Sequence, residues 1–510
     1  MTPEARVNSR RPALAGAVAV AAAFGVAELL AGLLSVGLSV VAAVGNLIID
    51  ISPESVVRFG IRVFGFYDKP VLIAGIVVVG IIAGGALGRL AVKKMTPAVL
   101  GFLIGGSIGT IAVLQDPLTS GPTGLIAVWG AVATGILALR FLFRTVEPVE
   151  PAEQDEGRRR FLLSLAGVTA FAAITAATGR VLVGRMREVL AGREDVILPR
   201  PFSSQAEPVT GDSLAVDGIS ELVTPNENFY RIDTAISVPR VDLDTWTLKI
   251  TGLVDRPVEL TFEDLLDLPM VERFVTLSCV SNRVGGTLVG HARWLGVPLA
   301  DLLDRAGVQA DATQIVGRSV DGFTVGFPAE AASDGREALV AVAMNGEPLP
   351  FDHGFPARLV VAGLYGYVSA TKWLSEIELT TWDAFDAYWI PRGWSKEAPV
   401  KTQSRVDVPR QNERLDAGTV PIAGVAWAPN RGVARVEVQV DDGPWIEAEL
   451  SAELSKDSWR QWAIDWEATT GEHVIQVRAT DSNGDTQTEQ VTAPAPNGAT
   501  GYHSRNVVVT

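Results

Sequence analysis

Residues 274–286 read FVTLSCVSNRVGG, and this stretch indicates how the second half of the chain folds. A β-like apolar run ends at Ser278, and Cys279 follows at the switch from strand to loop, where a side chain can project into a pocket. A thiolate is a soft, anionic ligand suited to a transition metal. One thiolate is enough where another molecule supplies the remaining ligands, although a lone cysteine is usually a small buried apolar residue.

Cys279 is the one cysteine among the 510 residues. Intrachain disulfides, cysteine-ligated iron–sulfur clusters and attached c-type haem are therefore excluded for this chain. No histidine or carboxylate cluster has the spacing of a zinc or iron site. A metal bound at Cys279 would take its remaining ligands from another molecule.

A second segment, residues 344–379, reads MNGEPLPFDHGFPARLVVAGLYGYVSATKWLSEIEL. His353, Arg358 and Lys372 lie on loops that flank an apolar strand, and the glycines let backbone N–H groups come close to a ligand. Arginine matches phosphate because it donates two parallel hydrogen bonds. The segment predicts contacts to a phosphate or another oxyanion, while each residue taken singly also fits a turn or a solvated surface.

The composition divides the chain into two halves. Hydrophobic residues make up 48% of the sequence and the mean hydropathy is +0.25, yet the net charge is -15. These values fit together only if an apolar half is joined to an acidic, soluble half. The acidic balance argues against nucleic acid as a partner, because no basic stripe is present to neutralise phosphates.

The apolar half, residues 1–180, predicts a bundle of about five transmembrane helices in a multi-pass membrane protein. The apolar stretches cover 13–44, 71–92, 98–114, 125–143 and 161–177, and a span needs roughly 20 apolar residues. The first stretch is longer than a span and carries Glu28, which leaves a tilt, a break or a continuation along the interface open. The lipid bilayer is therefore an expected partner.

Basic residues in the short loops predict the orientation of these helices. They all fall on one side of the membrane if five helices cross it and the N-terminus is cytoplasmic, which places everything after about residue 180 outside. The basic clusters are Arg6, Arg10 and Arg11; Arg89, Lys93 and Lys94; Arg140 and Arg144; and Arg158, Arg159 and Arg160.

The fifth stretch carries a possible export signal. Residues 157–179 read GRRRFLLSLAGVTAFAAITAATG, in which two arginines, one further residue and Phe161-Leu162 resemble a twin-arginine signal. Such signals export proteins that are already folded around a cofactor. The alternative is that the arginines anchor a helix by the positive-inside rule. All four histidines lie beyond these stretches, which excludes bis-histidine haem ligation in the spans.

The soluble half is expected to contain a linker (181–209), an α+β domain (210–400) and a β-sandwich of immunoglobulin type (401–510). Residues 433–450, VARVEVQVDDGPWIEAEL, alternate strictly around an Asp-Gly turn, which is typical of a hairpin. Because the sandwich has no cysteine pair, we expect tryptophans and aliphatic residues to form its core. The tryptophans are Trp427, Trp445, Trp462 and Trp466.

Together these segments resemble the sulfite oxidase family of molybdopterin enzymes. TPNENFYRIDT (224–234) is similar to the family's first pterin-binding segment, and TLSCVSNRVGG (276–286) to the segment whose cysteine binds molybdenum. Residues 344–361 and the following Lys372-Trp373 resemble the most recognisable stretch of the family. The resemblance covers 210–510, with the sandwich similar to the family's dimerisation domain, and leaves out the membrane helices.

The resemblance implies a molybdenum–molybdopterin cofactor with Cys279 as the protein's metal ligand, and no haem or iron–sulfur cluster in this chain. It also implies a catalytic group of Cys279, Arg231 and Arg283, whose arginines raise the positive potential for an anionic or dipolar substrate. His291 is a candidate proton relay, or simply a packed histidine. The implied cofactor-binding residues are Asn228, Phe229, Tyr230, Arg231, Cys279, Asp321, His353, Arg358, Thr371 and Lys372.

The chain departs from the sulfite-oxidising members of the family. Those carry a second arginine after the Asn-Arg pair, where this chain has Val284, and a tyrosine just before the MNG segment, where this chain has Val342-Ala343-Met344. The tryptophan-bearing stretch that follows the metal segment is shortened to GGTLVGHARW (285–294). The cofactor site therefore matches the family, while the sulfite site does not.

We expect a membrane-anchored oxidoreductase that transfers an oxygen atom to or from a small oxyanion, S-oxide or N-oxide. It would exchange electrons with a separate partner or the quinone pool and form a homodimer through the sandwich. One alternative is an exported, membrane-tethered binding or adhesion module with a non-catalytic molybdopterin-like domain. Another is a methionine-sulfoxide-type reductase that receives electrons from quinol through a membrane partner.

Overall fold

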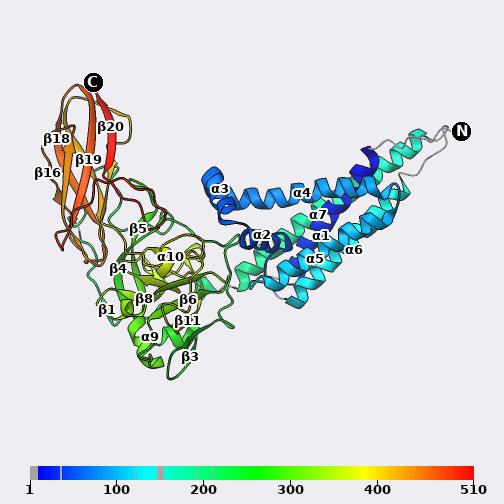
Figure 1. Cartoon of the computed structure of the whole chain (residues 1–510), viewed down its shortest axis with the longest axis horizontal. Coiled ribbons are helices and arrows are strands. Elements are labelled where there is room, and N and C mark those ends of the chain that lie inside the picture. The colour runs from blue at the N-terminus through cyan, green and yellow to red at the C-terminus, as the bar shows by residue number, and fades with distance from the viewer. Residues whose placement is uncertain (1–9, 35–36, 120, 146–153, 191, 210) are drawn as a thin grey trace. The chain divides into compact units, whose positions relative to one another are not determined.

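The computed structural model describes residues 10–34, 37–119, 121–145, 154–190, 192–209 and 211–510. It divides into two compact units. The first comprises Met1–Ala191 and Ala235–Arg240, and the second comprises Gly192–Thr234 and Val241–Thr510. Figure 1 colours the helices of the first unit blue to cyan, and the second unit green to red.

The first unit is helical, as the sequence predicts. In the described residues, five of its helices are long and apolar enough to cross a membrane: α1, α4, α5, α6 and Glu156–Gly184 within α7. The elements are α1 (Arg10–Leu33), α2 (Val40–Ile51), α3 (Glu54–Phe64), η1 (Gly65–Tyr67), α4 (Asp68–Ala91), α5 (Met95–Gln115), α6 (Gly121–Arg144) and α7 (Gln154–Leu190).

The long first apolar stretch breaks into two helices. α1 ends at Leu33, and α2 begins at Val40 after Ser39, whose hydroxyl accepts a hydrogen bond from the backbone N–H of Val41 at 3.2 Å. The same hydroxyl donates to the carboxylate of Glu28, which is buried in α1. Ser39 therefore caps α2 and partners the one acidic residue of α1.

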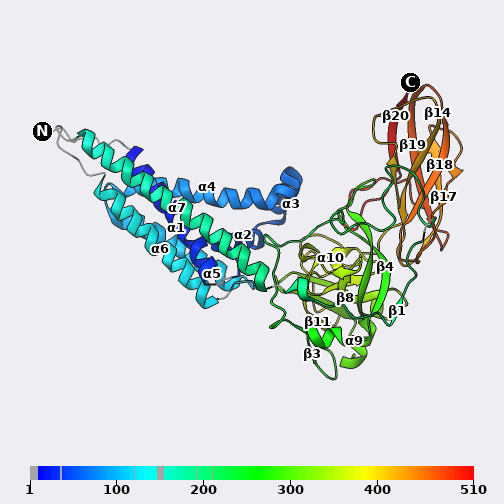
Figure 2. The same ribbon diagram turned by 180° about the vertical axis from the view of Figure 1, so that it is seen from behind.

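Small residues bring the long helices together. α1 packs against α4, α6 and α7, as both views of the molecule show (Figures 1 and 2). A Cβ added to Gly16 would overlap the carbonyl oxygen of Gly84, and one added to Gly88 would overlap that of Pro12. On α7, Gly179 lies equally close to the backbone of Glu28. The backbones touch because these positions have no side chain.

An α+β domain opens the second unit, and it contains two sheets. One has the order β1-β4-β5-β8-β10, with β9 paired to β8, and the other has the order β3-β2-β11-β6-β7. The strands are β1 (Ser203–Ser204), β2 (Thr247–Gly252), β3 (Val258–Thr261), β4 (Val271–Ser278), β5 (Val289–Pro298), β6 (Gln314–Ser319), β7 (Thr324–Pro328), β8 (Ala338–Met344), β9 (Glu347–Pro348), β10 (Arg358–Val361) and β11 (Leu374–Thr380).

Burial identifies the central strand of the first sheet, and a glycine explains where α9 ends. All seven residues of β8 are buried, as expected for a strand covered on both faces. α9 buries Leu299, Leu302, Leu303 and Ala306 on one face and ends at Gly307, which confirms the glycine stop predicted there. The helices and turns are η3 (Arg193–Asp195), α8 (Phe262–Leu266), α9 (Leu299–Ala306), η4 (Ala329–Ala332), η5 (Phe351–His353) and α10 (Gly366–Ser369).

The C-terminal region consists of two sheets, which confirms the predicted sandwich. Their orders are β12-β14-β18-β17 and β13-β20-β19-β15-β16. The strands are β12 (Gln403–Val408), β13 (Glu413–Leu415), β14 (Gly418–Trp427), β15 (Val433–Val440), β16 (Ile446–Glu447), β17 (Glu449–Leu450), β18 (Arg460–Ala468), β19 (Gly471–Asp481) and β20 (His503–Val509).

The four tryptophans play different parts in this region. Trp462 is fully buried in the sandwich core, and Trp466 packs against its edge. Trp427 is buried in the larger core that the α+β domain shares with the sandwich. The expectation for Trp445 was wrong: it is half-buried outside the core, between Tyr502 at 5.5 Å and Arg478, which stacks over its ring at 4.2 Å. The Asp-Gly turn before Trp445 carries it out of the core.

The sandwich and the α+β domain interlock within the second unit. The indole N–H of Trp459 donates to Leu222 O at 2.7 Å, and its backbone N–H donates to the Thr276 hydroxyl at 2.7 Å. Thr276 N–H donates in turn to Asp457 O at 2.9 Å. Because Thr276 lies in β4, residues 457–459 of the sandwich brace the strand that leads to Cys279.

Candidate active site

A cavity opens at the end of β4, and seven of the ten expected cofactor-binding residues line it. Residues of six regions meet there: the loop before β2, the loop after β4, the β6–β7 turn, the η5–β10 segment, the stretch from α10 to β11 and the loop after β11. The lining residues are Phe229, Tyr230, Ile232, Asp233, Thr234, Cys279, Ser319, Asp321, Phe323, His353, Arg358, Gly366, Tyr367, Ala370, Lys372, Trp373 and Trp389.

Cys279 is the first residue after β4 and is buried in the cavity wall. Its N–H donates to Leu288 O at 2.9 Å, and its carbonyl accepts from Asn282 N–H at 3.0 Å. The Asn282 side-chain oxygen accepts from Leu288 N–H at 2.9 Å, which closes the loop. Burial raises the pKa of the Cys279 thiol, although hydrogen bonds with Ser281 oppose this. The thiolate thus needs a positive partner such as a metal.

The sandwich holds the outer turn of this Cys279 loop (279–288). Arg405 of β12 is buried and donates to Gly286 O at 2.8 Å and to the Ser220 hydroxyl at 2.7 Å, while its Nε pairs with Asp407 at 2.6 Å. Gly285 has a φ of +73° and lies so close to the His503 ring of β20 that a Cβ would overlap it. Only glycine fits both the conformation and the space at this position.

Three buried basic side chains converge on the cavity from different elements. Lys372 donates to Asp233 Oδ2 at 2.8 Å and to Asp352 O at 2.9 Å. Burial lowers the pKa of Lys372 to about 8, although Asp233 acts in the opposite direction. Arg358 donates to His353 O at 3.1 Å and lies over the Trp294 ring at 5.0 Å. Burial lowers the pKa of Arg358 to about 10, so an anion in the cavity would relieve its desolvation.

His353 is the third basic residue of the cavity. Its Nε2 lies 3.1 Å from Asn226 O, and the Phe229 ring meets it edge-on at 5.5 Å. Burial, followed by the charge of Arg358, lowers the pKa of His353 to about 4. The neutral ring therefore donates from Nε2 to the carbonyl of Asn226 and presents its other nitrogen as an acceptor.

Further expected residues lie at or beside the cavity. Tyr230 stacks on Phe229 at 5.2 Å, and burial raises the pKa of Tyr230. The carboxylate of Asp321 accepts from Phe323 N–H at 3.1 Å, and burial raises its pKa. Thr371 does not line the cavity but is fully buried, and within the described part of the chain its hydroxyl has no hydrogen-bond partner.

Three expected residues are placed away from the cavity lining. The side chains of Asn228 and Arg283 are exposed. Arg231 pairs with Asp233 at 3.0 Å and with Asp352 at 3.2 Å, and its side chain is 43% exposed. The turn closed by Asn282 directs Arg283 outward, so adjacency to the metal segment in sequence does not place it in the cavity.

His291 is a packed histidine. It is fully buried, with Nδ1 at 2.6 Å from Leu222 O and Nε2 at 3.0 Å from the Ser458 hydroxyl. Burial lowers the pKa of His291 to about 4. It belongs to the junction with the sandwich and does not line the cavity.

Sequence reasoning missed several residues of the cavity wall. Asp233 lies in the quoted segment 224–234 and was detectable there, since an acidic residue among cations is a natural partner for them. Tyr367 and Trp389 gave no signal because their role depends on how distant loops pack. Among the described residues, no group of three histidine, cysteine, aspartate or glutamate side chains could hold a metal ion. Cys279 supplies the one thiol among the side chains that line this cavity.

Comparison with known proteins identifies two family domains in this chain. Residues 235–389 match the family of oxidoreductase molybdopterin binding domains, and residues 395–497 match the Mo-co oxidoreductase dimerisation domain. Over these two stretches the chain is similar to the sulfite oxidase family of molybdopterin oxidoreductases. The family's binding domain implies a molybdenum–molybdopterin cofactor.

Relatives in this family include sulfite oxidases of animals and plants. The mitochondrial sulfite oxidase of Homo sapiens is 29% identical over 341 residues, which cover 57% of this chain and 61% of that protein. The chain thus spans about three fifths of that relative's length. The sulfite oxidase of Arabidopsis thaliana is 29% identical over 335 residues, which cover 54% of this chain and 84% of that protein.

One solved structure, the sulfane dehydrogenase SoxCD from Paracoccus pantotrophus, matches with a TM-score of 0.49 and 23% identity. The match covers 58% of this chain and 85% of that one.

The residues of the cavity fit the implied cofactor. A pterin phosphate is an anion, and the cavity offers Lys372, Arg358 and His353 in a buried setting. A thiol for the metal lies in the same wall, and the unpartnered hydroxyl of Thr371 lies next to Lys372 in the chain. Cationic groups that are buried without sufficient partners are costly unless a ligand completes them. The donor set therefore matches an anionic, metal-bearing group.

Proposed function

We propose that this protein is a membrane-anchored oxidoreductase that transfers an oxygen atom to or from a small oxyanion, S-oxide or N-oxide. The observation that carries the proposal is a buried thiol, Cys279, in one cavity with three buried basic side chains. A bound molybdenum–molybdopterin would supply the change of oxidation state that accompanies oxygen transfer. The protein supplies the binding, the orientation and the electrostatic field.

Each group of residues has a separate task in this proposal. Cys279 would be the protein's ligand to the metal, and the closed loop around it fixes the direction of the thiolate. Lys372, Arg358 and His353 would bind the phosphate and the pterin. The remaining proposed cofactor contacts are Asn228, Phe229, Tyr230, Arg231, Asp321 and Thr371.

The two arginines outside the lining would act through other groups. Arg231 pairs with Asp233, which in turn pairs with Lys372, so it keeps the acidic wall neutralised. Arg283 is exposed and would raise the positive potential for an approaching anion. On this view Arg283→Gln raises KM for an anionic substrate at low salt and leaves kcat unchanged.

The cavity wall favours a substrate with an apolar part over sulfite. Phe323, Tyr367 and Trp389 line the cavity, and the Tyr367 ring lies 5.7 Å from that of Trp394. The positions where sulfite-oxidising members carry a tyrosine, Val342 to Met344, are fully buried apolar residues of β8. An organic S-oxide or N-oxide would bury its carbon atoms against these rings.

The helical unit would anchor the protein with the N-terminus in the cytoplasm and the catalytic unit on the extracytoplasmic side. The basic residues at the ends of α4, α6 and the start of α7 support this orientation by the positive-inside rule. The twin-arginine-like start of α7 would serve as the export signal. Electrons would pass to or from a separate partner or the quinone pool, and the dimerisation domain supports a homodimer.

The test is metal and pterin analysis of the purified full-length protein beside its Cys279→Ser variant. We expect about one molybdenum per chain with pterin in the wild type. Turnover of a sulfoxide by Cys279→Ser should fall by more than the roughly 100-fold typical of losing an outer-shell partner. Arg283→Gln is the control for the same loop, and it should keep its molybdenum. If protein made in a host able to supply both contains neither metal nor pterin, the enzyme proposal fails. The alternative of a membrane-tethered binding module then replaces it.

A further inference from the structure

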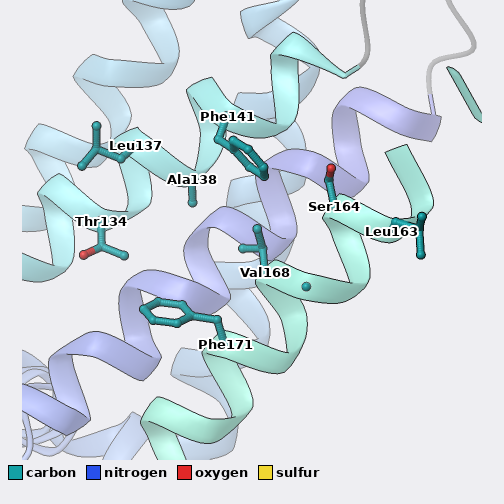
Figure 3. Close-up of a pocket in the computed structure, with 9 residues that line it drawn as sticks. Thr134, Leu137, Ala138, Phe141, Leu163, Ser164, Val168 and Phe171 are labelled. Atoms are coloured by element: carbon teal, nitrogen blue, oxygen red, sulfur yellow. The ribbon is translucent and has the colours of Figure 1, made fainter. Parts of the chain in front are cut away.

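A groove runs along the membrane helices between α6 and α7. Both helices pack on α1, while they barely touch each other, so a hollow of about 670 Å³ stays between them. Figure 3 shows its side chains: Phe141 and Phe171 point into the space between the two helices, while Leu137 and Leu163 point away from the facing helix. The walls include Leu137, Ala138 and Phe141 from α6, and Leu163, Val168 and Phe171 from α7.

Missing side chains leave the groove open on its α7 wall. Gly167 belongs to this wall, and a Cβ added there would meet no atom within 4 Å. The bulky residues beside it remain accessible: Leu137 and Leu163 are each 63% exposed, and Phe141 is 50% exposed. In a bilayer these apolar surfaces face acyl chains.

At one end of the groove, each of the two helices carries an arginine on the face that lines the groove. Arg144 follows Phe141 by three residues and Leu137 by seven, so it lies on the same face of α6. Arg160 precedes Leu163 by three residues and Gly167 by seven, so it lies on the same face of α7. Both side chains are exposed. The apolar hollow therefore ends between two cations.

These cations are accessible to a ligand. Arg140 and Arg144 are both exposed. Arg160 pairs with Glu156 at 3.3 Å, but the two side chains are 76% and 74% exposed, and such pairs contribute little. A phosphate between the arginines would be held by charge-assisted hydrogen bonds.

We propose that the groove between α6 and α7 binds one anionic phospholipid. One acyl chain lies between the helices against Gly167, and the phosphate lies between Arg144 and Arg160. Basic pockets between membrane helices are suited to anionic headgroups, and the apolar hollow beside them supplies the site for a chain. Arg140, on the same turn of α6, adds to the positive potential around the headgroup.

The experiment is native mass spectrometry of the full-length protein from micelles that hold equal amounts of phosphatidylglycerol and phosphatidylcholine. We expect the wild type to retain one phosphatidylglycerol per chain. Gly167→Leu fills the hollow and should lower retention on the order of tenfold, the effect of losing contact with about two methylene groups. Gly105→Leu is the matched control, because Gly105 is also an exposed helical glycine with no atom within 4 Å of an added Cβ.

A second pair of variants tests the headgroup. Arg144→Gln should lower retention of phosphatidylglycerol about fivefold and leave phosphatidylcholine unchanged. Arg89→Gln, which removes an exposed arginine from the last turn of α4, should change neither. The yield of each variant in the membrane fraction, compared with that of the wild type, shows that its helical unit is folded.

Three results would overturn the proposal. Equal retention of the two lipids would mean non-specific annular lipid, and so would equal retention by Gly167→Leu and Gly105→Leu. Loss of a co-purifying chain from Gly167→Leu alone would show that a transmembrane helix fills the groove.

Discussion

The helical unit and the junction of the sandwich with the α+β domain both bring distant segments into close contact, but by opposite means. In the helical unit the contact comes from absent side chains, since Gly16 and Gly88 let backbones touch. At the junction it comes from long polar side chains, since Arg405 and Trp459 reach backbone carbonyls of the other domain.

The difference follows from the backbone hydrogen bonds that each region still has to make. Membrane helices have already paired their backbone groups, so close packing is the remaining source of attraction. The loops around Cys279 leave carbonyls such as Gly286 O without a strand partner, and a buried carbonyl needs a donor. Substitutions at the two kinds of contact should therefore destabilise the protein in different ways.

The largest effect is expected for Gly88→Leu in the helical unit. A leucine there meets the backbone of Pro12, which cannot move aside as a side chain could. We expect a cost of more than about 3 kcal/mol, and little folded protein in the membrane fraction. Gly105→Leu has open space and should keep its yield and melting temperature. Equal yields of the two variants would show that backbone contact does not hold these helices.

The next effect is expected at the junction, for Arg405→Met. The change leaves Gly286 O without its donor and the Asp407 carboxylate with the Ser220 N–H alone, and losing one partner of a buried pair costs about 3–5 kcal/mol. Because Gly286 is in the Cys279 loop, the Mo(V) electron paramagnetic resonance spectrum should change as well.

The control for Arg405→Met is Arg431→Met. Arg431 pairs with buried Asp481 at 2.8 Å and donates to Val400 O at 2.9 Å. We expect a comparable loss of stability with an unchanged spectrum. A spectral change of the same size in both variants would reduce the role of Arg405 to general stability.

A pH dependence separates the junction from the helical unit, whose described part contains no histidine. The pKa of His291 is about 4 in the folded state and about 6.5 unfolded, so between these values the unfolded chain binds more protons. The free energy of unfolding should therefore fall as pH drops from 6.5 to 4, with a slope of up to about 1.4 kcal/mol per unit for this group. Chemical unfolding at several pH values measures it, and His291→Gln should flatten the slope.

The smallest effect is expected for Glu156→Gln, which removes the exposed ion pair with Arg160. The loss should be under about 0.5 kcal/mol and should shrink further with salt. A melting temperature measured at low and high salt tests this. A larger loss would mean that exposed charge pairs, and not only backbone contacts, hold the helical unit.

Local patterns made much of this architecture predictable. Apolar runs of span length predict the helices, and strict alternation around an Asp-Gly turn predicts the sandwich strands. Cys279, His353, Arg358 and Lys372 stand in contiguous motifs, and all four line one cavity. Their roles in binding a cofactor stay predictions until metal and pterin are measured.

What could not be predicted depends on tertiary packing. Arg405 and His503 lie in strands whose alternation gives no hint that they reach the Cys279 loop. Trp389 lies in a loop without a motif, and Arg283, which was assigned to the catalytic group, is exposed. The direction of a loop side chain depends on the turn that carries it, which sequence distance does not describe.

The contacts between the sandwich and the Cys279 loop also determine when, during synthesis of the chain, the site can be complete. The Trp459–Leu222 hydrogen bond joins positions 237 residues apart, and His503 comes later still. At roughly 5–20 residues per second, a ribosome needs on the order of ten seconds or more to pass from Gly285 to His503. During that interval the Cys279 loop exists without its brace, and its thiol is open to oxidants. A cofactor that binds at Cys279 would therefore meet its complete site only after the last sandwich strand, which carries His503, has been made.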